Sequence, residues 1–167
     1  LSEVWPDEST IHNSADRIFS VSKDGLDYLV DQKGLPREKI EVARLGVHLP
    51  EATASASGNE TVRIVSCSNL VPVKRVYLIA QVVQSLPFKV EWTHIGDGPK
   101  IDAVKSVTRD FDSAHEVIFK GRLSNQQVLQ YYQSNPVDIF INLSESEGVP
   151  VSIMEAMAHG IPCVATS

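Results

Sequence analysis

Short runs of strand-forming residues alternate with longer amphipathic segments through most of this chain. Beyond residue 61 these runs occupy residues 62–66, 90–95, 116–119, 137–143 and 162–166. The segments between them have the length and spacing of helices, at about 75–85, 100–108, 125–133 and 151–159. Strands that alternate with helices in this way are typical of βαβ units, in which the strands run parallel. The sequence therefore predicts an α/β fold built on a parallel sheet.

The order of the strands can also be predicted. Residues 137–143 (VDIFINL) are almost entirely apolar, as expected for a central strand that is buried on both faces. We predict a Rossmann-like, doubly wound sheet with strand order 3-2-1-4-5. In that order the first and fourth strands are neighbours, and a ligand binds between the loops that follow them. Those two loops are therefore the candidate site.

The first 60 residues follow a different pattern. Residues 17–21 and 39–45 are predicted to be strands, with a helix between them that Ser22 caps. Residues 51–60 are small and polar and are predicted to be a linker. We expect the tail of a preceding domain at 1–50, the linker at 51–60, and a binding domain at 61–167. Because the chain starts at Leu1 and stops directly after an apolar run, we expect a fragment whose last domain is incomplete.

Composition excludes one class of partner and indicates a compartment. The net charge is -6, which argues against a general nucleic-acid binder because such proteins carry a basic surface. Cys67 and Cys163 lie far apart in apolar runs and are predicted to be reduced thiols in the core. Reduced thiols fit a cytoplasmic protein.

Two adjacent cations, Lys74 and Arg75, end the loop that follows the first strand of the predicted sheet. They stand at the start of a helix, where the helix dipole makes positive charge mildly unfavourable. A bound anion would remove that conflict. The alternative is that both are solvated surface cations.

The loop after the fourth strand combines a possible anion site with two carboxylates. Gly148 permits a close backbone approach or a positive φ, and Pro150 suits the first turn of a helix. Free amides near Val151 can bind phosphate. Glu147 and Glu155 can face one cleft and accept hydrogen bonds from hydroxyl groups. The alternative is that Glu147 is an ordinary loop glutamate and Glu155 an exposed helical one.

The remaining loops carry weaker signals. Gly96 belongs to a turn (HIGDGP) that is expected to line the pocket, although it makes a poor dinucleotide fingerprint. Arg122 and Leu123 follow the third strand, where the backbone can form a wall for a nucleotide base or a plain turn. Asp110 and Asp112 resemble a metal-binding Asp-x-Asp pair but lie in a polar stretch ahead of the third strand. The histidines and cysteines lack metal-ligand spacing, so we predict no metal site.

Three stretches resemble glycosyltransferase family 4, a family of retaining enzymes with the GT-B fold. They are residues 69–75, 95–99 and 147–167, the last reading EGVPVSIMEAMAHGIPCVATS. This third stretch is the most specific, because it contains the family's pair of glutamates separated by seven residues. The resemblance extends from about Asp16 to Ser167. It implies that the chain is the donor-binding C-terminal domain of a GT-B protein with a tail of the acceptor-binding N-terminal domain.

The resemblance also implies roles for individual residues. Lys74 matches the lysine that holds the donor diphosphate, and Glu147 matches the glutamate near the donor sugar, so these two are expected to act in catalysis. Glu155 matches the glutamate that holds the ribose hydroxyls. Backbone amides of the loop after the fourth strand are expected to contact the donor as well. The full expected binding set is Asn69, Lys74, Arg75, Gly96, Arg122, Leu123, Glu147, Gly148, Val149, Val151 and Glu155.

Two positions depart from the family pattern. Asn69 stands where the family usually has a phosphate-binding arginine, and Arg75 stands where glycine is usual. We expect Arg75 to supply the missing charge, either directly or through electrostatics.

The implied reaction is retaining transfer of a sugar from a nucleoside diphosphate sugar to an acceptor hydroxyl in glycan or polysaccharide biosynthesis. We expect it to need no metal or cofactor, because cationic groups and helix amides stabilise the departing diphosphate. The acceptor, a glycan or a lipid-linked sugar, is expected to bind the N-terminal domain, and the fragment alone is expected to be inactive. The parent protein is expected in the cytoplasm or at the cytoplasmic face of the membrane.

Other readings stay open. A nucleotide-sugar-binding module without catalysis, or a degenerate homologue, is favoured by Asn69. A sugar-nucleotide epimerase is disfavoured by the spacing of Glu147 and Glu155. A dinucleotide-dependent oxidoreductase is disfavoured because the first strand is not followed by a glycine-rich fingerprint.

Overall fold

The computed structural model describes residues 14–58, 60–109, 111 and 115–166. The chain divides into two compact units, of which the first ends at Gly46 and the second begins at Val47. The predicted ligand-binding loops all belong to the second unit.

The first unit is a small βαβ arrangement. Strand β1 (Ile18–Ser20) pairs in parallel with β2 (Ile40–Val42), and helix α2 (Lys23–Asp31) and the 3-10 turn η1 (Arg37–Lys39) connect them. The Ser22 side chain accepts a hydrogen bond from the Gly25 amide, which confirms the predicted helix cap. Gly34 then adopts a φ of 67° and ends the helical segment.

The second unit contains a five-stranded parallel sheet. Its strands are β3 (Val62–Cys67), β4 (Val90–Ile95), β5 (His115–Gly121), β6 (Ile139–Asn142) and β7 (Cys163–Ala165). Their order is β5-β4-β3-β6-β7, with every neighbouring pair parallel. This confirms the predicted order 3-2-1-4-5 and the Rossmann-like α/β fold, and it places β3 beside β6.

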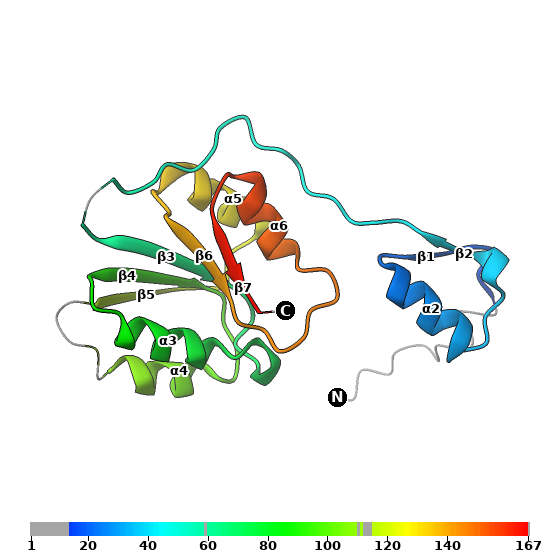
Figure 1. Cartoon of the computed structure of the whole chain (residues 1–167), viewed down its shortest axis with the longest axis horizontal. Coiled ribbons are helices and arrows are strands. Elements are labelled where there is room, and N and C mark those ends of the chain that lie inside the picture. Colours follow the sequence, from blue (N-terminus) through cyan, green and yellow to red (C-terminus); the bar gives the residue numbers. More distant parts are fainter. Residues whose placement is uncertain (1–13, 59, 110, 112–114, 167) are drawn as a thin grey trace. The chain divides into compact units, whose positions relative to one another are not determined.

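Helices cover both faces of this sheet. Figure 1 shows α3 (Val76–Ser85) and α4 (Ile101–Thr108) on one face, with α5 (Asn125–Ser134) and α6 (Val151–Ala158) on the other. A 3-10 turn, η2 (Pro72–Lys74), precedes α3. None of the helices in the described part of the chain is long and apolar enough to cross a membrane.

A separate apolar core lies under each pair of helices. Ile64 and Trp92 pack with residues of α3 and α4, whereas the adjacent Val65 packs with Val128 of α5 and Ala156 of α6. Because side chains alternate along a strand, β3 contributes to both cores. Burial on both faces explains why the sequence around β6 is a nearly continuous apolar run, whereas Arg63 and Ser66 interrupt the apolar residues of β3.

The predicted linker, residues 51–60, lies within the second unit, and several hydrogen bonds tie it to the rest of that unit. The Ala54 amide donates to the His159 carbonyl oxygen over 2.8 Å, and the Val137 amide donates to Ser55. The Ser57 amide and hydroxyl both bind the Asp138 carboxylate, at 2.8 and 2.7 Å. Residue 137 is therefore tied to this segment, and β6 is shorter than the predicted 137–143.

Candidate functional site

Two loops meet at the carboxyl edge of the sheet because β3 and β6 are neighbours. The loop after β3 runs into η2, and the loop after β6 runs into α6. A backbone hydrogen bond joins them directly, since the Glu145 amide donates to the Val73 carbonyl oxygen over 2.8 Å. The two loops that the sequence predicts to form the binding site are thus in contact.

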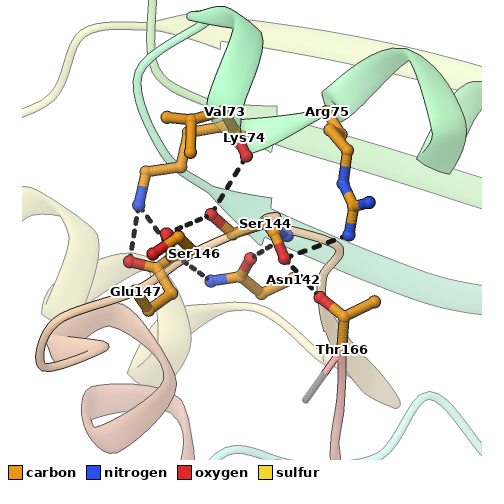
Figure 2. Close-up of polar contacts among 8 residues, drawn as sticks. All are labelled: Val73, Lys74, Arg75, Asn142, Ser144, Ser146, Glu147 and Thr166. Carbon is orange, nitrogen blue, oxygen red and sulfur yellow. Dashed lines mark hydrogen bonds and ion pairs between the residues drawn. The ribbon is translucent and has the colours of Figure 1, made fainter.

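Lys74 and Glu147 form the centre of this junction. The Lys74 Nζ lies 2.7 Å from both carboxylate oxygens of Glu147 (Figure 2). Asn142, the last residue of β6, donates its side-chain amide to Glu147 Oε1 over 2.9 Å. Partial burial acts to raise the pKa of Glu147, but hydrogen bonds from Lys74 and Asn142 outweigh it and lower that pKa below its usual value. Glu147 is therefore an ionised acceptor held by a cation.

A cavity of about 320 Å³ opens beside this ion pair. The predicted binding residues that line it are Asn69, Lys74, Gly96, Arg122, Leu123, Glu147, Val149 and Val151. They come from the loops after four different strands, β3, β4, β5 and β6. The structure thus gathers most of the predicted set around one concave site, the usual form of a small-molecule site.

The turn after β4 reaches the cavity because it contains two glycines. A Cβ atom on Gly96 would lie 1.9 Å from the Ser68 carbonyl oxygen, and one on Gly98 would lie 2.7 Å from that of Leu70. Only glycine permits this close approach. The Leu70 amide also donates to Asp97, so the turn after β4 forms one wall together with the loop after β3.

The start of α6 differs in two respects from expectation. The Val151 amide, which was expected to be free for an anion, donates to the Val149 carbonyl oxygen over 2.9 Å. Gly148 lies outside the described lining of the cavity, and a Cβ atom added to it would meet nothing within 4 Å. Gly148 also does not adopt a positive φ, and its contact with the donor stays a prediction.

Glu155 lies behind the cavity wall. Its side chain is buried, and Oε1 accepts a hydrogen bond from Asn125 Nδ2 over 2.6 Å. Burial, reinforced by the negative charge of Glu155, raises the pKa of the Cys67 thiol to about 11. Cys67 lines the cavity and Glu155 does not, so the charge of Glu155 reaches the cavity lining at the Cys67 thiol.

The side chain of Arg75 lies elsewhere than the sequence predicts. Its guanidinium donates from Nε to the Leu143 carbonyl oxygen at 2.8 Å and from Nη2 to that of Ser144 at 3.1 Å. It lines a second cavity, of about 340 Å³, together with residues that include Tyr77 and Lys100. Arg75 does not line the cavity that Asn69 lines, and two of its N–H donors bind backbone carbonyl oxygens, which argues against a direct supply of the charge missing at Asn69. The electrostatic alternative stays a prediction.

The backbone of Arg75 is also unusual. It adopts a left-handed conformation, with a φ of 45°, which is uncommon for residues other than glycine and costs roughly 1–2 kcal/mol. This conformation accounts for the glycine that the resemblance leads one to expect at this position.

Sequence reasoning missed Asn142, which orients Glu147. A polar residue at the end of an otherwise apolar strand was the available signal, since the end of β6 lies at the point where the strand order reverses. Ser144 and Thr166, which bind the same loop, gave no signal of their own.

The described residues contain no group of three or more His, Cys, Asp or Glu side chains that could hold a metal ion. Asp110 and Asp112 lie outside the described residues. The thiols of Cys67 and Cys163 are unpaired.

Comparison with known proteins identifies a family for the second unit. Residues 61–167 match the family described as Glycosyl transferases group 1. The chain is 29% identical over 105 residues to N-acetyl-alpha-D-glucosaminyl L-malate synthase of Bacillus anthracis, covering 62% of this chain and 26% of that protein. It is 27% identical over 142 residues to the amylovoran biosynthesis glycosyltransferase AmsK of Erwinia amylovora, covering 80% and 35%.

A solved structure shows the same fold. Anabaena HepE in complex with UDP and glucose superposes with a TM-score of 0.72 at 20% identity, over 94% of this chain and 46% of that one. The chain therefore spans a quarter to a half of the lengths of these three proteins.

Proposed function

The chain belongs to the family Glycosyl transferases group 1, and we propose that it is the donor-binding half of an enzyme of glycan or polysaccharide biosynthesis. The reaction proposed is transfer of a sugar from a nucleoside diphosphate sugar to an acceptor hydroxyl. The observation that carries this proposal is the Lys74–Glu147 pair, which stands where the loops after the neighbouring strands β3 and β6 meet. That point is where doubly wound sheets bind nucleotides.

Lys74 is proposed to hold the donor diphosphate. Lys74 lines the cavity and only 24% of its side chain is exposed, so its charge is only partly screened. The departing diphosphate gains negative charge in the transition state, and a fixed cation stabilises that charge without reorganising. In the free protein Lys74 is paired with Glu147, so the phosphate has to displace Glu147 from Lys74 or bind Lys74 together with it.

The two glutamates are proposed to bind hydroxyl groups of the donor. Glu147, at the cavity, would accept hydrogen bonds from the sugar once Lys74 turns to the phosphate. Glu155 would bind the ribose, which requires its carboxylate to exchange Asn125 for the ligand. The loop that contains Arg122 and Leu123 is proposed to contact the nucleotide base.

The finer features of the reaction are proposals as well. We propose retention at the anomeric carbon, with no metal ion, and with the leaving phosphate accepting the acceptor's proton. Both carboxylates are engaged in polar contacts rather than placed as an acid and a nucleophile, which supports this scheme over a glycosidase-like one. HepE, whose structure contains UDP and glucose, supports a nucleoside diphosphate as the donor's leaving group.

The surroundings of the reaction are proposed from the organisation of the chain. The acceptor, a glycan or a lipid-linked molecule, would bind an N-terminal domain, and the first unit is proposed to be the tail of that domain. The reaction would take place in the cytoplasm or at the cytoplasmic membrane face. Unpaired thiols at Cys67 and Cys163 support that compartment.

A second function, nucleotide-sugar binding without transfer, is favoured by Asn69. This neutral side chain lines the cavity where the family resemblance leads one to expect a cation, so the site has one positive charge fewer.

A transfer assay on the full-length parent protein separates the two functions. With UDP-, GDP- and ADP-sugars as donors, one base should support transfer, and Lys74→Ala should raise the barrier by ~2–4 kcal/mol, which is about 30- to 1,000-fold in kcat/KM. Lys89→Ala, an exposed lysine directly before β4, is the control and should retain wild-type turnover. Donor binding without any transfer would instead establish the binding module.

A further inference from the structure

Arg75 connects the two loops of the site without facing its cavity. In Figure 2 the side chains of Lys74 and Arg75 leave one turn in different directions, Lys74 towards Glu147 and Arg75 towards the Ser144 carbonyl oxygen. The guanidinium binds two successive carbonyl oxygens, those of Leu143 and Ser144. A planar fork of N–H groups can do this, whereas a lysine ammonium cannot present the same two donors.

The peptide held by Arg75 is the one that places Glu147. The Ser144 amide donates to Asn142 Oδ1 over 2.8 Å, and the other end of that Asn142 side chain donates to Glu147 Oε1. The Ser144 hydroxyl lies within hydrogen-bond distance of the carbonyl oxygens of Val73 and Ser146. These contacts join the two loops, or join residues of the loop that follows β6 to one another and to Asn142 at the end of that strand.

A further donor acts on the same carbonyl oxygen. The Thr166 hydroxyl, directly after β7, also binds the Ser144 carbonyl oxygen. Arg75 therefore binds both the Leu143–Ser144 peptide, whose N–H donates to Asn142, and the Ser144–Glu145 peptide, which Thr166 binds as well. Holding these peptides restrains the Asn142 side chain, which in turn donates to Glu147 beside Lys74.

We propose that Arg75 is a positioning residue, which sets the geometry of Lys74 and Glu147 by clamping the loop after β6 through its main-chain carbonyl oxygens. The expected effect of Arg75 on sugar transfer rests on the proposed function. The expected effect of Arg75 on the geometry of Glu147 does not depend on that function. Arg75 thereby acts on the site through the backbone of the neighbouring loop and not by contact with the donor.

Two substitutions separate positioning from charge. Arg75→Lys keeps the positive charge but loses the two-pronged contact, and Arg75→Gly loses both while it removes the left-handed strain. A positioning role predicts similar losses in both variants. A phosphate-binding role predicts that Arg75→Lys retains most of the function. Thr166→Val removes the other donor to Ser144 and should act in the same direction, with a smaller effect.

The first readout is independent of catalysis. A carbon-13 NMR titration of the Glu147 carboxyl, assigned with Glu147→Gln, reports how well that side chain is held in the full-length protein. In Arg75→Lys and Arg75→Gly its pKa should rise towards the ordinary glutamate value, because the hydrogen bonds that depress it are loosened. Lys89→Ala should leave it unchanged. Unaltered titration of Glu147 in both Arg75 variants and in Thr166→Val refutes the inference, whether or not the wild-type protein transfers sugar.

The second readout is catalytic. Both Arg75 variants should lower kcat about tenfold or more, while the melting temperature identifies any variant that does not fold. Wild-type turnover in Arg75→Lys together with at least about tenfold weaker UDP binding in Arg75→Gly would assign Arg75 to the phosphate instead. Lack of transfer by the wild-type protein contradicts the proposed function but leaves the NMR result to decide the inference.

Discussion

Replacing Glu147 with glutamine should tighten binding of a nucleoside diphosphate while slowing sugar transfer. In the free protein both carboxylate oxygens lie 2.7 Å from Lys74 Nζ, so the cation that binds phosphate is already occupied. A glutamine keeps the shape and one acceptor oxygen but removes the charge. The lysine is then released for the ligand. Transfer should slow because a neutral amide binds the donor sugar less strongly than a carboxylate does.

The size of the effect follows from the burial of the pair. Hydrogen bonds that involve charged groups contribute about 1.5–3 kcal/mol net. The side chains of Lys74 and Glu147 are 24% and 23% exposed, so solvent screens part of this energy. Surface pairs contribute at most about 1 kcal/mol. We therefore expect a gain of about 1 kcal/mol in binding free energy, or about fivefold in Kd.

Isothermal titration calorimetry of the full-length protein with UDP, GDP and ADP measures this effect. Lys74→Ala should weaken binding of the same nucleotide that Glu147→Gln binds more tightly. Glu145→Gln is the matched control, because it removes the same charge from an exposed position in the same loop that lines the other cavity. Weaker binding in Glu147→Gln, comparable to that in Lys74→Ala, would refute the view that Glu147 competes with phosphate.

Further predictions concern the walls of the site and the fold around it. Gly96→Ala should destabilise the protein by about 2–4 kcal/mol in urea unfolding, because its Cβ meets Ser68, whereas Gly121→Ala, with a φ of 67° and open space, should cost only about 1 kcal/mol. Asp138→Asn should cost about 1–3 kcal/mol at pH 7. Burial acts to raise the pKa of Asp138, but hydrogen bonds to the carboxylate outweigh it and lower that pKa in the folded protein. The stability that Asp138 contributes is therefore present above its pKa in the unfolded chain and is lost as the pH falls through its pKa in the folded protein. Between pH 7 and 3, the free energy of unfolding should fall less steeply in Asp138→Asn than in the wild-type protein. Glu155→Ala should weaken nucleotide binding more than it lowers the melting temperature, and a large fall in melting temperature without ligand would make Glu155 a structural residue.

Much of the fold could be predicted because the burial of strands and helices determines how apolar residues are spaced in the sequence. β6 is buried on both faces, so it appears as a nearly continuous apolar run, and the helices of the second unit appear as amphipathic segments. The strand order followed from the position of these runs and the rules of parallel sheets. The lengths of β2 and β6 were overestimated because apolar residues continue past the last ladder hydrogen bond.

The side-chain geometry was less predictable. Sequence places two cations side by side at residues 74 and 75, but it does not reveal that Arg75 adopts a left-handed backbone that turns the two side chains apart. The burial of Glu155 against Asn125 depends on packing between α5 and α6, which no local pattern encodes. The role of Asn142 depends on a loop that folds back onto the end of its own strand.

The central claim is that the cavity beside Lys74 binds the nucleoside diphosphate of a sugar donor. The most direct test is calorimetric titration of the wild-type protein with UDP, GDP and ADP, with and without EDTA, repeated for Lys74→Ala. The account predicts that one of the three nucleotides binds, that EDTA leaves its affinity unchanged, and that Lys74→Ala weakens it by at least about tenfold. Absence of binding to the full-length protein, or equal affinity in Lys74→Ala, would contradict it.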